Sequence, residues 1–193
     1  MVLLLLAASL TFTKSFPGSV PDYWRIALQE NGDAEYFVAA DDTKPVKFKV
    51  SEALVKQAFD LSTKLNHFKD PVESKRKVAF VGKKTMVWEN GSERGEVTFN
   101  FSEIPEAAEL AWLFERISNT QQTLQELQRL MHFDKLGLMK YLLETEIALE
   151  HKDLADPVNL VPVLEQISVG KSYMDICRQR SRIILDKIQT PAK

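Results

Sequence analysis

The sequence is short of cysteine and has no excess of basic charge. It contains one cysteine in 193 residues, so an intrachain disulfide framework and a cysteine-rich metal site are both excluded. Its 25 Lys and Arg residues are balanced by 27 Asp and Glu residues, whereas a dedicated nucleic-acid-binding domain carries a clear basic excess. We therefore expect neither a disulfide scaffold nor a nucleic-acid binder.

The motifs that carry a recognised catalytic or phosphate-binding mechanism are also missing. The sequence has no G-x-G-x-x-G, no P-loop, no H-E-x-x-H, no G-x-S-x-G and no EF-hand loop. Its three histidines come from three separate segments, so a histidine-based metal site would need nearly all of them. The sequence therefore predicts no metal and no cofactor.

The longest apolar run, at residues 2–10, is too short to cross a membrane. A transmembrane helix needs about 20 such residues, so we expect no transmembrane span. An apolar run followed by small residues is typical of a secretory signal peptide. We therefore expect residues 1–15 to be removed and the mature protein to be periplasmic or extracellular. No Lys or Arg precedes the run, and the alternative is a buried N-terminal strand or helix.

The rest of the first half has the pattern of a sheet with one helix. Short runs rich in β-branched and aromatic residues, separated by turn residues, predict strands at residues 23–29, 34–40, 46–51, 77–81, 85–89 and 96–102. Residues 51–68 carry apolar side chains at spacings of three and four, which predicts a helix. We expect an antiparallel or mixed sheet of about six strands with this helix packed on one face.

The second half is predicted to be entirely helical. An apolar stripe runs through residues 105–133, which would form a helix of about 44 Å at 1.5 Å per residue. A helix of this length would either bend near Asn119 and Thr120 or project beyond the sheet and pack on the later helices. A second helix follows to about residue 152, and the segment from residue 159 divides at Gly170 into two more. The predicted fold class is therefore α+β, with a strand-rich part at residues 16–104 and a helical part at residues 105–193 that shares one core with it.

Ionisable side chains concentrate at the predicted junction between the two long helices. His132 and Asp134 lie close together there, and a carboxylate that orients a histidine is the arrangement of a general base. Arg116 is a further candidate for such a dispersed catalytic site. The alternative is structural, with His132 bonding the last carbonyls of one helix and Asp134 capping the next. We favour the structural alternative.

A second set of candidates surrounds the predicted hairpin near residue 82. Its basic residues would form a patch for an anionic ligand, or else solvate and protect an exposed strand; they are Lys75, Arg76, Lys77, Lys83 and Lys84. Trp88, beside a glycine-containing loop, is either an exposed platform or part of the core. Lys83, Lys84 and Trp88 are therefore the candidate binding residues.

The chain resembles a group of uncharacterised exported bacterial proteins in three stretches, KVAFVGKKTMVWENGSERGEVTFNFSE, LFERIS and FDKLGL. The resemblance covers most of the chain after Pro21 and implies export, a strand-rich first half and a helical second half. It implies no activity, cofactor or catalytic residue. We expect a non-enzymatic binding or protein-interaction module with a protein or envelope partner. The alternative is a hydrolase-like envelope enzyme with its site at His132 and Asp134.

Overall fold

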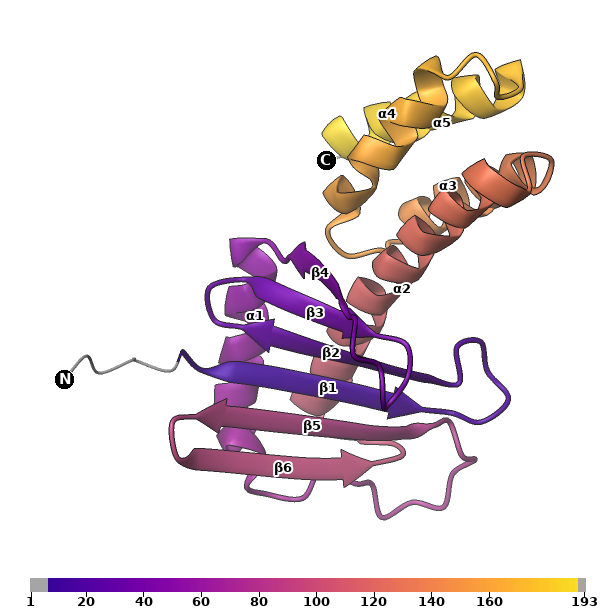
Figure 1. The fold of residues 1–193 in the computed structure, drawn as a ribbon. Coiled ribbons are helices and arrows are strands. Elements are labelled where there is room, and N and C mark those ends of the chain that lie inside the picture. Colours follow the sequence, from indigo (N-terminus) through magenta and orange to yellow (C-terminus); the bar gives the residue numbers. More distant parts are fainter. Residues whose placement is uncertain (1–6, 191–193) are drawn as a thin grey trace. The chain divides into compact units, whose positions relative to one another are not determined.

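A computed structural model describes residues 7–190 of the chain. The chain divides into two compact units, Met1–Glu115 and Arg116–Lys193, called unit 1 and unit 2 below. The boundary falls inside helix α2 (Pro105–Phe133) rather than at its start. The predicted α+β class is confirmed, because the N-terminal half holds a six-stranded antiparallel sheet and the C-terminal half is helical (Figure 1).

Unit 1 is built on one sheet with the strand order β4-β3-β2-β1-β5-β6. The strands are β1 (Ser9–Ser15), β2 (Tyr23–Gln29), β3 (Asp33–Phe37), β4 (Val46–Lys49), β5 (Lys83–Asn90) and β6 (Glu93–Phe99). Each strand is antiparallel to its neighbours, and β1 pairs with β2 on one side and with β5 on the other. The first strand of the chain is therefore an inner strand of the sheet.

The core of unit 1 lies between one face of the sheet and two helical segments, α1 (Glu52–Lys64) and the first turns of α2. Leu10 and Phe12 on β1 are buried, whereas Thr11 and Thr13, which point to the opposite face, are only partly buried. The ring of Phe12 stacks on Trp24 of β2 and on Phe114 of α2, each at a centroid distance of 5.2 Å. Figure 1 shows α1 running behind the sheet.

The inner position of β1 bears on the predicted signal segment at residues 1–15. Removal of residues 1–15 would take away the strand that β2 and β5 share, together with the buried Phe12 side chain. In the structure residues 9–15 form a strand with buried side chains, as in the alternative that the sequence leaves open, and removal of residues 1–15 stays a prediction. Residues 1–6 of the predicted signal segment lie outside the described residues. Export itself stays a prediction.

A correction concerns residues 77–81, for which the sequence predicts a strand. They form a loop before β5, and Val78, Phe80 and Val81 in it are exposed. Both sides of β5 are already paired, with β1 and with β6. The segment therefore has no place beside β5, and the predicted hairpin around residue 82 does not form.

A short turn, η1 (Asn66–Phe68), follows α1 and packs on β5 and β6. All three of its residues have positive φ angles, between 50° and 61°. The ring of His67 stacks on Trp88 of β5 at a centroid distance of 4.0 Å. The carbonyl oxygen of His67 lies over Gly95 of β6, where a Cβ atom would come within 1.7 Å of it. Contact with the turn therefore requires glycine at this position.

Unit 2 contains the remainder of α2 and has its own apolar core. Its other elements are α3 (Gly137–Glu150), η2 (Pro157–Leu160), α4 (Val161–Val169) and α5 (Asp175–Gln189). The unbroken helix at 105–133 and the division near Gly170 confirm the predicted helices. Cys177 lies in this core, where burial raises the pKa of its thiol. None of the described helices is both long and apolar enough to cross a bilayer.

Candidate functional site

The structure does not bring the three candidate catalytic residues together. Arg116 and His132 lie on the same helix, about 24 Å apart along its axis at 1.5 Å per residue. His132 and Asp134 are exposed, and the Asp134 carboxylate accepts a hydrogen bond from the backbone N–H of Gly137 at 2.9 Å. The guanidinium of Arg116 donates to the carbonyl of Leu154 at 3.2 Å. Asp134 and Arg116 thus make local structural contacts in unit 2.

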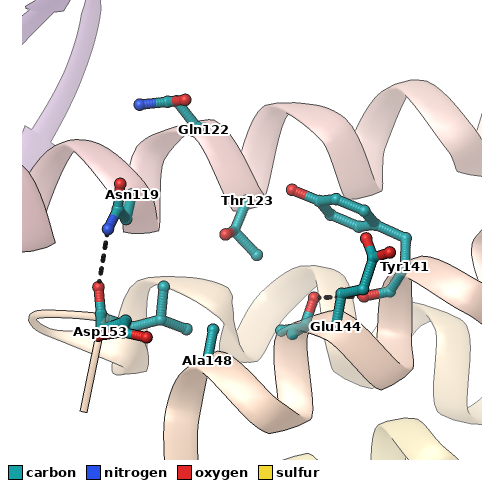
Figure 2. Close-up of a pocket in the computed structure, with 9 residues that line it drawn as sticks. Asn119, Gln122, Thr123, Tyr141, Glu144, Ala148 and Asp153 are labelled. Carbon is teal, nitrogen blue, oxygen red and sulfur yellow. Dashed lines mark hydrogen bonds between the residues drawn. The ribbon is translucent and has the colours of Figure 1, made fainter. Parts of the chain in front are cut away.

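A cavity of about 300 Å³ between α2 and α3 is lined mainly by polar side chains (Figure 2). Several of its polar groups already have partners within unit 2. Asn119 donates to the carbonyl of Asp153 at 3.1 Å, and the Thr145 hydroxyl donates to the carbonyl of Tyr141 at 2.8 Å. Its two carboxylates, on Glu144 and Asp153, are exposed. We assign no ligand to this cavity, because it offers no buried charge.

The three candidate binding residues on β5 have different environments. Trp88 is only 6% exposed and lies against the His67 ring, so it presents no open platform. Lys83 is exposed at the start of the strand. Lys84 is buried at 8% exposure and lines a cavity. Lys84 is therefore the candidate around which a site can be built.

The cavity at Lys84, called the Lys84 pocket below, has a volume of about 280 Å³. It lies at the end of the sheet where β5 begins and β6 ends, because Lys84 is paired with Phe99 across these strands and with Lys14 on β1. The segment after β6 and the first turns of α2 complete the walls. The lining residues are Lys14, Val81, Lys84, Phe99, Asn100, Phe101, Ser102, Ala108, Ala111, Trp112 and Glu115.

The Lys84 ammonium group is only partly satisfied within the protein. Its Nζ donates to the carbonyl oxygen of Asn100 at 2.9 Å, and an ammonium group has three donors. Burial lowers the pKa of Lys84, and the positive charge of Lys14 adds to this shift, whereas the Glu115 and Glu73 carboxylates oppose it. The fold therefore holds a cation in an environment that disfavours its charge.

The carboxylate in the lining of the pocket is bound to a different lysine. Lys14 Nζ lies 2.8 Å from Glu115 Oε1, and both side chains are partly exposed. Among the residues that line the pocket, two lysines thus share one carboxylate. The lining of the pocket therefore carries two positive charges and one negative charge, while Glu73, which also acts on Lys84, lies outside the lining.

Aromatic side chains form much of the remaining wall. The Phe99 ring lies beneath Lys84, with Nζ 5.9 Å from the ring centroid. Phe101 and Trp112 are more open, and Trp112 is 48% exposed whereas Trp24 and Trp88 are buried. Apolar walls with a few placed polar groups are typical of small-molecule sites. This arrangement is suited to an anionic group attached to an apolar body.

Two features of the sequence indicate part of this site: the basic cluster around residue 82, and the alternation that puts Lys84 in phase with Met86 and Trp88. Lys84 belongs to the basic cluster, but the predicted strand begins at Thr85 and leaves Lys84 in a turn. In the structure β5 begins at Lys83, so Lys84 alternates in phase with the buried Met86 and Trp88. That alternation is visible in the sequence. The sequence does not identify Trp112 as part of this site, because local sequence does not show which side of α2 reaches the end of the sheet.

The comparisons with known proteins do not assign the chain to a family. No protein-family model matches the chain, and no curated protein is significantly similar to it. Between residues 7 and 190, no three His, Cys, Asp or Glu side chains are grouped in a way that would hold a metal ion. The functional argument therefore rests on the Lys84 pocket.

Proposed function

We propose that the protein is a non-enzymatic binding module that takes up small carboxylates with an apolar body in the Lys84 pocket. The observation that carries this proposal is the buried, incompletely bonded ammonium group in an aromatic-walled cavity. A bound carboxylate would form a direct ion pair with Lys84, which no carboxylate of the described residues does, and charge-assisted hydrogen bonds of this kind are about twice as strong as neutral ones.

The size and the walls of the pocket narrow the ligand class. Its volume of about 280 Å³ is at the lower limit of ligand pockets, which usually range from about 300 to 1,000 Å³. Phe99, Phe101 and Trp112 offer apolar surface to the body of a ligand. A single aromatic or aliphatic ring that carries one carboxylate matches these dimensions and this charge.

The hydrolase alternative receives no support from the geometry. His132 and Asp134 are exposed at the junction between α2 and α3, and neither lines the polar cavity of unit 2 or the Lys84 pocket. The binding role is therefore the better supported of the two.

A titration with phenylacetate and with its neutral analogue phenylacetamide tests the proposal. We expect phenylacetate to change the tryptophan fluorescence in a saturable manner, because Trp112 is an exposed wall of the pocket. The amide should bind at least about tenfold more weakly, a difference of about 1.4 kcal/mol. Lys84→Met should abolish phenylacetate binding, whereas the matched control Lys83→Met, which changes an exposed neighbour, should retain it. Equal binding of acid and amide, or full binding by Lys84→Met, would refute the proposal.

The substitution Lys84→Met is also expected to change the thermal stability of the protein. Because the pKa of Lys84 is lowered in the folded state, the unfolded chain binds more protons between that lowered pKa and the ordinary value of about 10.4. The stability contributed by Lys84 therefore increases as the pH rises through this window. We expect Lys84→Met to unfold thermally at or above the wild-type midpoint at pH 7, with a difference that narrows towards pH 10. A large loss of stability at pH 7 would show instead that the lysine is structural.

A further inference from the structure

We propose that unit 1 docks on anionic membrane surfaces through two adjacent loops. The first, called the basic loop, comprises residues 75–82 and is followed directly by Lys83. The second, the β1–β2 loop, comprises residues 16–22. Val81 belongs both to this loop and to the wall of the Lys84 pocket. The residues substituted in the test below do not line the pocket, so the two proposals can fail independently.

Both loops expose apolar side chains to solvent. In the basic loop, Val78, Phe80 and Val81 are 41%, 55% and 43% exposed, and Val20 in the β1–β2 loop is 97% exposed. Single exposed apolar residues are ordinary on protein surfaces, but clusters of them indicate interaction sites. Three such residues within four positions form a cluster of this kind.

Contacts between the loops place them side by side. The rings of Phe16 and Phe80 meet edge to face at a centroid distance of 5.8 Å. Ser15, the last residue of β1, is paired with Lys83, the first residue of β5, so both loops leave the sheet at the same end (Figure 1). Their apolar side chains thus belong to one region of the surface.

The basic loop is held in shape although it is not part of the sheet. The Asn100 side chain accepts a hydrogen bond from the backbone N–H of Val81 at 2.7 Å and donates one to the carbonyl of Ala79 at 3.0 Å. The loop therefore presents its valines and phenylalanine from a fixed backbone. Docking would therefore cost less conformational entropy, because the loop is already ordered by contacts within unit 1.

Exposed cations surround this apolar region. Lys75, Arg76, Lys77 and Lys83 are all exposed. Arg76 is paired with Glu103 at 3.1 Å, but no ion pair is found for the three lysines within the described residues. Protection of an exposed strand is the structural role that the sequence suggests for these charges. That role does not apply, because residues 77–81 form no strand. The lysines are therefore available to anionic groups outside the protein.

The combination of apolar and basic side chains favours a lipid surface over a soluble polyanion. Phenylalanine and valine insert into the interface between headgroups and acyl chains, while lysines contact anionic headgroups. A nucleic acid would use the lysines but would gain little from the exposed valines, since its backbone offers only charge. An anionic bilayer engages both kinds of side chain at once.

Vesicle sedimentation with the full chain tests this proposal. We expect binding to vesicles of phosphatidylcholine with about 30% phosphatidylglycerol, at least about tenfold weaker binding to pure phosphatidylcholine, and a decrease at high salt. The triple variant Lys75→Gln, Lys77→Gln, Lys83→Gln and the single variant Phe80→Ser should each lose at least about tenfold in binding. A charge-matched control, Lys44→Gln, Lys47→Gln, Lys64→Gln, removes three exposed lysines elsewhere in unit 1 and should bind normally.

Two outcomes would overturn the membrane proposal. One is equal binding by the triple variant and its charge-matched control, which would make the attraction non-specific. The other is retention on heparin without vesicle binding, which would indicate a soluble polyanion as the ligand. Lys84→Met should bind vesicles like the wild type, so its result separates this surface from the Lys84 pocket. Circular dichroism on every variant checks that the fold is intact.

Discussion

Replacement of Phe12 by alanine is expected to destabilise unit 1 by about 3–5 kcal/mol, the usual cost of truncating a buried phenylalanine. The Phe12 side chain is fully buried on an inner strand and stacks on Trp24 and on Phe114. Its removal would leave a cavity between the sheet and α2 and would eliminate both ring contacts. Urea denaturation followed by circular dichroism and tryptophan fluorescence measures the loss.

The neighbouring residue provides a matched control. Thr13 lies on the same strand but points to the opposite face, where it is only partly buried. We expect Thr13→Ala to cost less than about 1 kcal/mol, the range of strand propensities. Equal costs for the two variants would contradict the orientation of β1.

The position of β1 also makes a prediction about processing. A chain that begins at Phe16 should fail to form unit 1, because β2 and β5 would lose their shared partner. If the protein is exported with cleavage, the cleavage site must precede Ser9. N-terminal sequencing of folded protein from its producing cells checks this, and a stable mature chain that starts after Ser15 would refute it.

Gly95→Ala is the second substitution with a large expected effect. We expect it to lower the free energy of unfolding by about 3 kcal/mol or more, at or above the upper end of the usual cost of overpacking a core. The added Cβ would lie 1.7 Å from the His67 carbonyl oxygen. Neither side can easily give way, because Gly95 is paired with Trp88 in the sheet and His67 belongs to a turn in which every residue has positive φ. Thermal unfolding gives the cost, and the fluorescence of Trp88, which stacks on His67, reports displacement of the turn.

Gly91 serves as the control for this substitution. It has a φ of 60°, and no neighbouring atom lies within 4 Å of the place that an added Cβ would occupy. Gly91→Ala therefore carries only the left-handed backbone penalty of about 1–2 kcal/mol. Gly95 is not in that region, so its expected cost is steric. If Gly95→Ala is as stable as Gly91→Ala, the close contact between η1 and β6 does not exist.

The elements whose burial follows a simple period are the ones that the sequence predicts well. The strand predicted at residues 23–29 forms as β2 with the same bounds, because buried and partly buried residues alternate along it. The stripe through residues 105–133 likewise predicts a helix over the residues that form α2. In both elements one face is buried, so apolar residues recur along the sequence with the period of a strand or of a helix.

The strand β1 and the loop at residues 77–81 are hard to predict for a common physical reason. Leu10 and Phe12 alternate with Thr11 and Thr13, but the preceding leucines make the whole segment resemble one apolar run. Residues 77–81 have a strand composition and yet form a loop. Which segment pairs with β5 is decided by long-range hydrogen bonding and packing, and local composition does not encode that choice.

The candidate site shows the same division between residue type and environment. The basic cluster identifies Lys84 as a binding candidate, but its burial depends on where β5 begins and on α2 covering that end of the strand. Trp112 and Glu115 reach the pocket from α2, far along the chain from Lys84. The cation of the site is therefore predictable from the sequence, whereas the walls around it are not.

The arrangement of β1 also sets the order in which a growing chain can complete unit 1. β2 follows β1 after one short loop, so this hairpin can form early in synthesis, whereas the other partner, β5, begins only at Lys83. Until β5 emerges from the ribosome, one edge of β1 has no hydrogen-bond partner, and unpaired edges invite association between chains. The β5–β6 hairpin and the first turns of α2 therefore close the sheet last, and they convert an aggregation-prone nascent sheet into the finished unit.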